Sequence, residues 1–453
     1  MTGIIRSIRL GSSDRSSGRP FRHFFVIEQR GCAVKKFLLS VVLSAFVFLI
    51  LSPSALQAEG RIKFGNLTIV PSVTAQAVYD DNIYLGNGKS SGGLAEDDVQ
   101  DWITHVKPGI LFNFNFPERG SLNLGYQGDW AFYDDYSDND WNSQQGKLDF
   151  NYNAPAGLIL GVTDTYNRSE DPYGDANQYG LGQVTKRWTN DLRTKAGWEL
   201  GKTFRTILYF NHYKQDYKYE KDDAQDYEDM EGGIGFGAKF LPKTWGFVRY
   251  FYGQREYTED NATLNLNEDT NSDFSWHRVS AGLTWDPAAK IQGELNVGYQ
   301  WNAFNNDRTP TGALRDDQDT WVAETSLNYK PIESTTLSLT LARAVRVTGA
   351  DKNEYFEDTS VGFNLRQEFL RKLVFSAGFT YSLNDYENAT AVDIWGRPVD
   401  REDDNYIATA GLDYNIQDWI SLGVAYKYNQ KNSNDDSNDF TDNQVMATLK
   451  LSY

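Results

Sequence analysis

The chain has 453 residues and a formal net charge of −18; 14% of its residues are aromatic and only 12 are prolines. An acidic surface repels the phosphates of nucleic acid, so the composition argues against a nucleic-acid partner. Many aromatic residues and few prolines also argue against a disordered chain. The composition therefore indicates a folded protein that binds no nucleic acid.

The first predicted element is a secretory leader. A stretch from Phe37 to Leu51 is almost wholly apolar, follows a pair of lysines and is followed by the small residue Ala58. This order of a charged segment, an apolar segment and a small residue is typical of a signal peptide. The apolar stretch is about 15 residues long, whereas a helix that spans a membrane needs about 20. We therefore expect residues 34–58 to be a signal peptide that is cleaved near Ala58.

The segment before this leader fits no part of a signal peptide. We expect residues 1–33 to be a non-native upstream extension, with translation beginning at Val34. The single cysteine, Cys32, lies in this extension, so the processed chain has neither disulfides nor thiolate metal sites. Residues 59–453 carry 36 Lys and Arg against 60 Asp and Glu, a net charge of −24.

From residue 59 onward, about eighteen segments alternate apolar with polar residues, and each predicts a β-strand. Examples are the rows Leu122, Leu124 and Tyr126, and Tyr426 and Tyr428. Successive side chains of a strand point to opposite faces, so each strand has one apolar and one polar face. No apolar run after the leader approaches the length of a spanning helix, about 18 residues or more.

The connections between these segments alternate in length. Eight tight turns, such as Phe116–Gly120, alternate with nine long loops rich in Asp, Asn and Gly. An even strand number, short periplasmic turns and long extracellular loops are typical of bacterial outer-membrane barrels. We therefore predict an all-β fold, a transmembrane antiparallel β-barrel of about 18 strands over residues 59–453 in the cell outer membrane. A soluble sandwich or propeller would pack its apolar faces on another layer and would not show this difference between loops.

The last segment predicts how the barrel closes. If the last strand were unpaired and in water, its apolar row would be exposed. If it pairs with the first strand, which we expect over Val70–Tyr79, the apolar row faces lipid. An aromatic last residue preceded by alternating apolar residues resembles the C-terminal recognition signal of outer-membrane barrels, and the resemblance implies recognition by the barrel assembly machinery. The residues of this assembly signal are Val445, Ala447, Leu449, Leu451 and Tyr453.

The first strand carries a second resemblance. The sequence PSVTAQAVYDDNIYL, from Pro71 to Leu85, resembles the start of the putative β-barrel porin 2 family, in which an alternating strand ends in Tyr-Asp-Asp-Asn or a similar sequence. The resemblance implies an outer-membrane barrel, surrounded by lipid and lipopolysaccharide, that is associated with exopolysaccharide export and has polysaccharide as its cargo.

The polar rows of the strands are candidates to line an aqueous lumen. Eight basic and seven acidic residues fall on these rows, a nearly balanced wall unlike the rings of one sign in ion-selective filters. These charges either pair with one another or contact a hydrated solute such as a saccharide, with inward Asn and Gln adding donors and acceptors. The candidates are Lys107, Asp129, Arg193, Lys195, Lys239, Arg278, Glu294, Glu324, Arg366, Glu368, Asp413 and Lys427, together with Asp149, Glu199 and Lys450.

The remaining acidic residues fall in the long loops. Pairs such as Asp97 and Asp98, or Asp403 and Asp404, could hold divalent cations through their oxygen atoms. None has the spacing of a dedicated calcium loop, so we expect solvated loops, no metal site and no cofactor. Loops with this charge would repel anionic solutes at the mouth.

Catalytic motifs are not found in the sequence. The histidines of the processed chain are His105, His212 and His277, and none lies in a G-x-S-x-G or H-E-x-x-H motif. We therefore predict that the protein is not an enzyme but an outer-membrane pore for passive passage of hydrophilic solutes, with saccharides or exopolysaccharide as cargo. The alternative is a non-conducting surface barrel that serves adhesion or envelope structure. The sequence leaves open whether the lumen is open or plugged.

Overall fold

The computed structural model describes residues 62–87, 99–171, 185–258, 272–285, 290–308, 317–347, 355–392 and 397–453. The chain divides into two units, Met1–Ala58 and Glu59–Tyr453, and all of the described residues belong to the second. The predicted upstream extension, the signal peptide and its cleavage near Ala58 lie outside the described residues and stay predictions.

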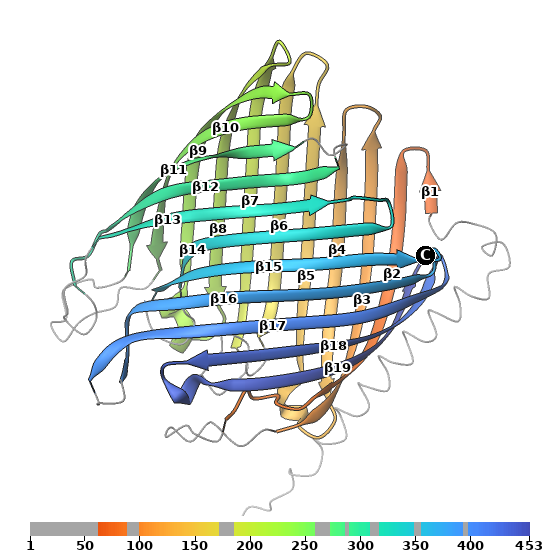
Figure 1. The fold of residues 1–453 in the computed structure, drawn as a ribbon, viewed down its shortest axis with the longest axis vertical. Helices are drawn as coiled ribbons and strands as arrows, with labels where there is room; N and C mark the ends of the chain where they lie inside the picture. Colours follow the sequence, from red (N-terminus) through yellow and green to blue (C-terminus); the bar gives the residue numbers. More distant parts are fainter. Residues whose placement is uncertain are drawn as a thin grey trace, which may run out of the picture. The chain divides into compact units, whose positions relative to one another are not determined.

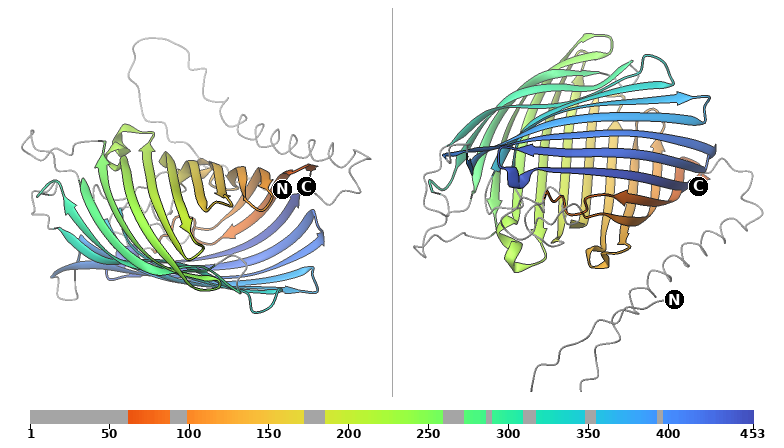
Figure 2. Two further views of the ribbon diagram at one scale, coloured as in Figure 1. Left: turned by 90° about the horizontal axis from the view of Figure 1, so that it is seen from above. Right: turned by 60° about the horizontal axis from the view of Figure 1, so that its bottom comes forward.

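Eighteen antiparallel strands, β2 to β19, form a closed barrel (Figures 1 and 2). Each strand pairs with its neighbours in sequence, and β19 pairs with β2 to close the sheet. The short strand β1 pairs with the start of β2. The predicted strand number and antiparallel barrel are confirmed. The strands are β1 Ile62–Phe64, β2 Leu67–Asp80, β3 Asp101–Phe116, β4 Gly120–Tyr133, β5 Trp141–Asn153, β6 Leu158–Asp171, β7 Thr185–Leu200, β8 Phe204–Tyr217, β9 Tyr227–Leu241, β10 Thr244–Tyr257, β11 Phe274–Trp285, β12 Ile291–Phe304, β13 Gln318–Tyr329, β14 Thr335–Val347, β15 Tyr355–Phe369, β16 Leu373–Val392, β17 Pro398–Gln417, β18 Ile420–Ser433 and β19 Phe440–Ser452.

Helical structure in the described part of the chain is limited to three short 3-10 segments, η1 Ser137–Asn139, η2 Glu220–Gln225 and η3 Asp436–Asn438. Over these same residues, no helix has the length and apolar character needed to cross a bilayer.

The connections have different lengths at the two ends of the barrel. At one end, here called the tight-turn end, two residues join β9 to β10 and two join β17 to β18. At the other, the loop end, the connection from β10 to β11 runs over residues 258–273. The turn after β7 holds Gly201 and Lys202 at φ +61° and +62°, the left-handed pair of a primed hairpin turn, whose twist matches that of the strands. The predicted alternation of short and long connections is confirmed.

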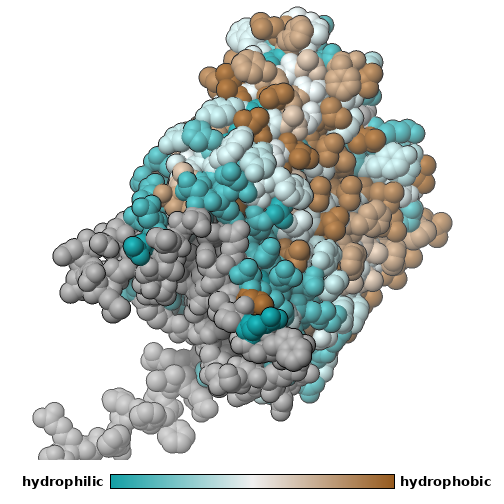
Figure 3. Space-filling model, turned by 60° about the vertical axis from the view of Figure 1, so that its left-hand side comes forward, coloured by the Kyte–Doolittle hydropathy of each residue, from teal (hydrophilic) through white to brown (hydrophobic). Residues whose placement is uncertain are grey.

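The outward face of the barrel is apolar. Val424 is 60% exposed, Phe236 58% and Leu208 57%, although all three lie in the middle of strands. Figure 3 shows such apolar side chains gathered over a broad area of the barrel wall, beside a hydrophilic region. In water this surface would be an unusually large apolar patch. A bilayer core is the solvent that suits it.

Aromatic side chains border this apolar surface. Toward the loop end, the rings of Tyr79 and Trp102 lie 5.3 Å apart and those of Tyr299 and Trp301 lie 5.0 Å apart. Toward the tight-turn end, exposed aromatic side chains include that of Trp198. Two such girdles are typical of the two membrane interfaces of a barrel. The strand segments between them are therefore assigned as membrane-spanning.

The closing seam uses the predicted residues. Backbone pairing of β19 with β2 runs from Gln444 opposite Asp80 to Ser452 opposite Ser72, and the Tyr453 N–H donates to the Pro71 carbonyl at 2.9 Å. The predicted pairing of the last strand with the first is confirmed. The recognition of this strand by an assembly machinery stays a prediction.

The two faces of β18 provide a test of the lipid-facing surface. We expect Val424→Arg to destabilise the barrel in lipid vesicles by about 2–4 kcal/mol, because an arginine near the bilayer midplane on the lipid face is penalised by that amount. Urea unfolding in vesicles measures the change. The neighbouring substitution Ala425→Arg places the same side chain on the inward face and should cost less. Equal losses for the two variants would contradict the assigned faces.

Candidate functional site

The predicted lumen-lining residues occupy the strand positions that alternate with the exposed apolar side chains. Lys427, for example, lies between Tyr426 and Tyr428 on β18 and opposite Thr409 and Gln444 on the neighbouring strands. Contact of the predicted residues with a solute stays a prediction. The remaining residues that share this placement are Lys107, Asp129, Asp149, Arg193, Lys195, Glu199, Lys239, Arg278, Glu294, Glu324, Arg366, Glu368, Asp413 and Lys450.

Two of the predicted residues are brought together directly. The Lys107 ammonium lies 3.2 Å from an Asp129 carboxylate oxygen, and His105 Nδ1 lies 2.9 Å from the other. Lys107 also donates to the Gln76 side-chain oxygen at 3.0 Å. This cluster joins β2, β3 and β4 across the inner wall.

Other predicted residues pair with partners that the sequence analysis did not select. The guanidinium of Arg249 on β10 donates two hydrogen bonds, of 2.6 and 2.8 Å, to Glu294 on β12. Arg278 on β11 donates to Glu231 on β9 at 2.5 Å, and Trp276 Nε1 donates to the same carboxylate at 2.9 Å. These bonds cross one intervening strand, so they tie strands that are not backbone neighbours.

A further pair extends this network toward the loop end. The guanidinium of Arg255 on β10 donates two hydrogen bonds of 2.7 Å to Asp229 on β9. Because charge-assisted bidentate bonds fix both distance and orientation, Arg255 and Arg249 are held against the wall. Positive and negative groups alternate over β9 to β12 as paired charges.

The inner wall of β8 to β11 is also aromatic, which differs from the expected polar row. The Arg249 guanidinium carbon lies 3.8 Å from the centroid of the Phe247 ring, and that of Arg255 lies 4.0 Å from the Tyr227 ring. That of Arg205 lies 4.4 Å from the Trp245 ring. A cation over a ring face is attracted by the ring quadrupole. The arginines cover these rings, so a charged layer lies between the aromatic side chains and the interior.

A cavity of about 640 Å³ lies against the inner wall formed by strands β5 to β14. This volume lies within the range of about 300–1,000 Å³ that is usual for small-molecule sites. Of the predicted residues, Arg193, Lys195, Arg278 and Glu324 line it. The cavity wall also includes the paired residues Arg249, Arg255, Asp229 and Glu231 and the amide residues Asn296 and Gln300.

The residues that sequence reasoning missed lie mainly on β8, β9 and β10. In β10, TWGFVRYFYGQREY, aromatic residues occur at both parities, so the alternation that marks inward positions is lost. The available signal was the spacing of Arg249 and Arg255, which are six residues apart and so share one face of a strand. Glu294 on β12, the partner of Arg249, was among the predicted residues, but Asp229 on β9, the partner of Arg255, was not.

The histidines contact acidic groups or a tyrosine. His212 Nε2 lies 2.7 Å from a Glu228 carboxylate oxygen, and His277 Nδ1 lies 2.7 Å from the Tyr250 hydroxyl. Over the described residues, no serine, threonine or cysteine side chain contacts a histidine nitrogen. The assignment of the protein as a non-enzyme stays a prediction.

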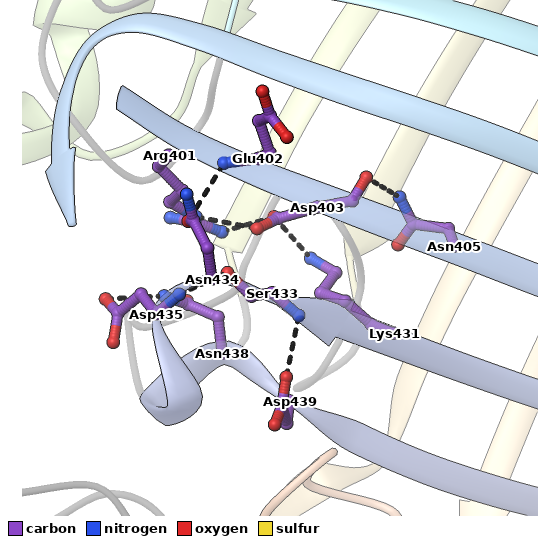
Figure 4. A network of polar contacts seen from close by, with 10 residues as sticks. All are labelled: Arg401, Glu402, Asp403, Asn405, Lys431, Ser433, Asn434, Asp435, Asn438 and Asp439. Atoms are coloured by element: carbon purple, nitrogen blue, oxygen red, sulfur yellow. Dashed lines mark hydrogen bonds and ion pairs between the residues drawn. The ribbon is translucent and has the colours of Figure 1, made fainter. Parts of the chain in front are cut away.

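A second polar network lies at the loop end, beyond the membrane-spanning segments (Figure 4). Asp403 on β17 is fully buried; it accepts hydrogen bonds of 2.9 and 2.6 Å from Arg401 and lies 3.4 Å from the Lys431 ammonium. Ser433 N–H donates to Asp439 at 2.7 Å, which holds the following loop to β18. The expectation of a solvated acidic loop is wrong for Asp403, because two basic side chains compensate for its burial. Asp97 and Asp98 lie outside the described residues.

The surroundings of Asp403 shift its pKa downward. Burial alone would raise the pKa of this carboxyl, but the hydrogen bond from Arg401 and the charge of Lys431 outweigh burial and lower it below 3.8. A carboxyl whose folded pKa is depressed adds stability above its unfolded pKa. That stability is lost as the pH falls through the folded value.

We expect Glu231→Gln to lower the urea midpoint of the folded barrel. The change leaves Arg278 and Trp276 without their carboxylate, and breaking a buried ion pair costs about 3–5 kcal/mol. The matched control is Glu324→Gln, because Glu324 lines the same cavity and has no ion pair among the described residues. Equal midpoints for the two variants would show that the Arg278 pair does not stabilise the wall.

We expect Asp403→Asn to lower the melting temperature at pH 7, with the deficit relative to the native protein shrinking as the pH falls below about 4. Melting curves followed by circular dichroism between pH 3 and 8 measure it. Asp418→Asn, in the exposed turn between β17 and β18, is the control and should change little. A deficit that is constant over this pH range would contradict the ionised pair.

The chain matches one family model and is similar to several solved structures. No curated protein matches the chain. Among solved structures, it is similar to the outer membrane protein OpdK of Pseudomonas aeruginosa, with 11% identity, 85% of this chain and 99% of OpdK covered, and a TM-score of 0.39. It is also similar to OccAB4 of Acinetobacter baumannii, with 12% identity, 85% and 98% coverage, and a TM-score of 0.40. The family model described as "Putative beta-barrel porin 2" matches residues 54–453. The chain therefore belongs to the putative beta-barrel porin 2 family.

Proposed function

We propose that the protein is an outer-membrane pore for passive passage of hydrophilic solutes, with saccharides as the preferred class and exopolysaccharide as the cargo. The observation that carries this proposal is a closed barrel that is apolar outside and has, on its inner wall, a cavity of about 640 Å³ lined by paired charges and amides. Membership of a porin family supports the same function.

The charges of the wall favour neutral solutes. Each of the arginines Arg249, Arg255 and Arg278 has a carboxylate partner, so much of the wall presents local dipoles rather than a ring of one sign. A ring of one sign would select ions by charge. Paired groups instead offer hydrogen bonds, which a hydrated sugar can exchange with those of water.

Amide groups lie beside these charges on the inner wall. Asn296 and Gln300 line the cavity, and Asn113 and Asn123 lie opposite each other on β3 and β4. An amide side chain can both donate and accept hydrogen bonds, so a wall that carries amides suits a polyhydroxylated solute.

The proposal also includes the molecules that would contact the barrel and its orientation in the membrane. Outer-membrane lipid and lipopolysaccharide would contact the apolar outer face, and the barrel assembly machinery would recognise the final strand before closure. Signal-peptide cleavage near Ala58 would release the chain into the periplasm. The tight-turn end would then be periplasmic and the loop end extracellular, as is usual in such barrels.

Conductance in planar bilayers tests the pore. We expect discrete steps from the purified native protein, because a water-filled barrel conducts ions. Ala342→Trp, at a position that lines the cavity, should lower the step size, whereas Leu341→Trp, on the lipid side of the same strand, should leave it unchanged. A protein that inserts but shows no steps would instead favour the non-conducting surface barrel.

Liposome swelling tests the cargo separately. Proteoliposomes should swell in neutral sugars at rates that fall with sugar size. Small anions of similar size should enter more slowly, because the acidic loops repel them at the mouth. Entry of anions as fast as sugars would refute the saccharide preference while leaving the pore intact.

A further inference from the structure

Three carboxylates meet at the loop end of the closing seam. Asp80 is the last residue of β2, Asp81 follows it, and Asp442 lies on β19 directly beside them. One oxygen atom from each carboxylate lies within 4.8 Å of the other two. Asp80 is 6% exposed and Asp442 is 2% exposed, so two of the three negative groups are taken out of water.

One buried oxygen of this group has no partner. Asp81 accepts from the backbone and side-chain nitrogens of Asn443 at 2.7 and 2.8 Å, and Asp80 accepts from Asn82 N–H at 2.9 Å. Gln444 donates to both Asp80 and Asp442, at 3.0 and 3.1 Å. The second oxygen of Asp442, Oδ1, is buried and accepts no hydrogen bond. A buried polar atom without a partner costs about 1–3 kcal/mol, and more when it is charged.

The basic side chain near these three carboxylates does not neutralise their negative charge. Lys427 is the basic side chain that acts on Asp442, but burial and the charges of Asp80 and Asp81 outweigh it. These influences raise the pKa of Asp442 to about 7. The group lies on the loop side of the Tyr79 and Trp102 rings, outside the membrane-spanning segments. An isolated buried carboxylate is costly and is normally neutralised by a proton, a basic partner or a metal ion.

We propose that Asp80, Asp81 and Asp442 bind one hard divalent cation, with Ca²⁺ as its best representative, at the outer end of the barrel seam. Three carboxylates supply up to six oxygen atoms, which is the chemistry that Ca²⁺ prefers, and water completes its flexible coordination shell. The cation takes the unpaired Asp442 oxygen as a ligand. The site is independent of any solute that passes through the pore.

The position of the site indicates what the cation does. Regular backbone pairing between β19 and β2 ends at Gln444 and Asp80. One more backbone hydrogen bond follows it, from Asp81 N–H to the Asn443 carbonyl at 3.2 Å. A cation held by β2 and β19 together would join the first and last strands at that end. Asn82 reinforces the same join, because its side-chain amide donates to the Thr441 carbonyl at 2.9 Å.

Other acidic pairs in the described loops differ from this group. Asp134 and Asp135 are exposed to solvent, and over the described residues the Asp80 group alone brings three potential ligands within reach of one ion. Asp134 therefore serves as a control for weak binding of cations to acidic loops.

Calorimetric titration of the full processed protein in detergent at pH 8, with Ca²⁺ raised to about 10 mM, tests the site, since weak extracellular sites have dissociation constants of about 0.1–1 mM. We expect one saturable site. Asp442→Asn should weaken binding by about tenfold or more, because it removes one charged ligand, and Asp134→Asn should not. Asp81→Asn is the second ligand variant, for use if Asp442→Asn does not fold.

A second readout is the temperature at which the folded band disappears on a denaturing gel. EDTA at pH 8 should lower this temperature for the native protein and for Asp134→Asn but not for Asp442→Asn. Absence of saturable Ca²⁺ binding, or equal binding by the native protein and the ligand variant, would overturn the proposal and leave a shared proton as the neutralising group. Neither result would change the conductance that tests the pore.

Discussion

The constraint on which the rest of the structure depends is that backbone N–H and C=O groups in a bilayer have no water to bond. A sheet satisfies that constraint only if its first and last strands pair. Here β19 pairs with β2 and closes the sheet. The alternation of apolar and polar side chains along each strand follows from this closure. Once the sheet is closed, each strand has one face toward lipid and one toward the interior.

Closure leaves an interior in which polar groups must find partners. The arginines of β10 and β11 do so with carboxylates on β9 and β12, and their guanidinium planes lie over aromatic rings from the same wall. The result is a wall in which these positive and negative charges are paired one to one. Such a wall is what the proposed passage of neutral solutes requires, because a ring of one sign would select by charge.

The sequence was informative where side chains obey a local rule. Strand number, turn positions and the pairing of the last strand with the first were predicted from period-two alternation and from the lengths of the connections, and the structure confirms them. The rule failed in β10, where Trp245, Phe247 and Phe251 are inward and Val248, Tyr250 and Tyr252 are outward. Both parities look apolar there, so Arg249 and Arg255 could not be assigned to the interior.

Local rules of this kind do not predict which side chains on different strands contact each other. Lys107 and Asp129 were both selected as inward residues, but their contact depends on the register of β3 against β4. Asp403 was expected in solvent, because the sequence does not show that Arg401 and Lys431 enclose it. By itself the sequence determined the barrel, its strand count and its lipid-facing rows, since these depend on residues two apart. Only the tertiary structure decided which charges meet, including Asp80 with Asp442 across 362 residues of chain, because closure alone brings the two ends together.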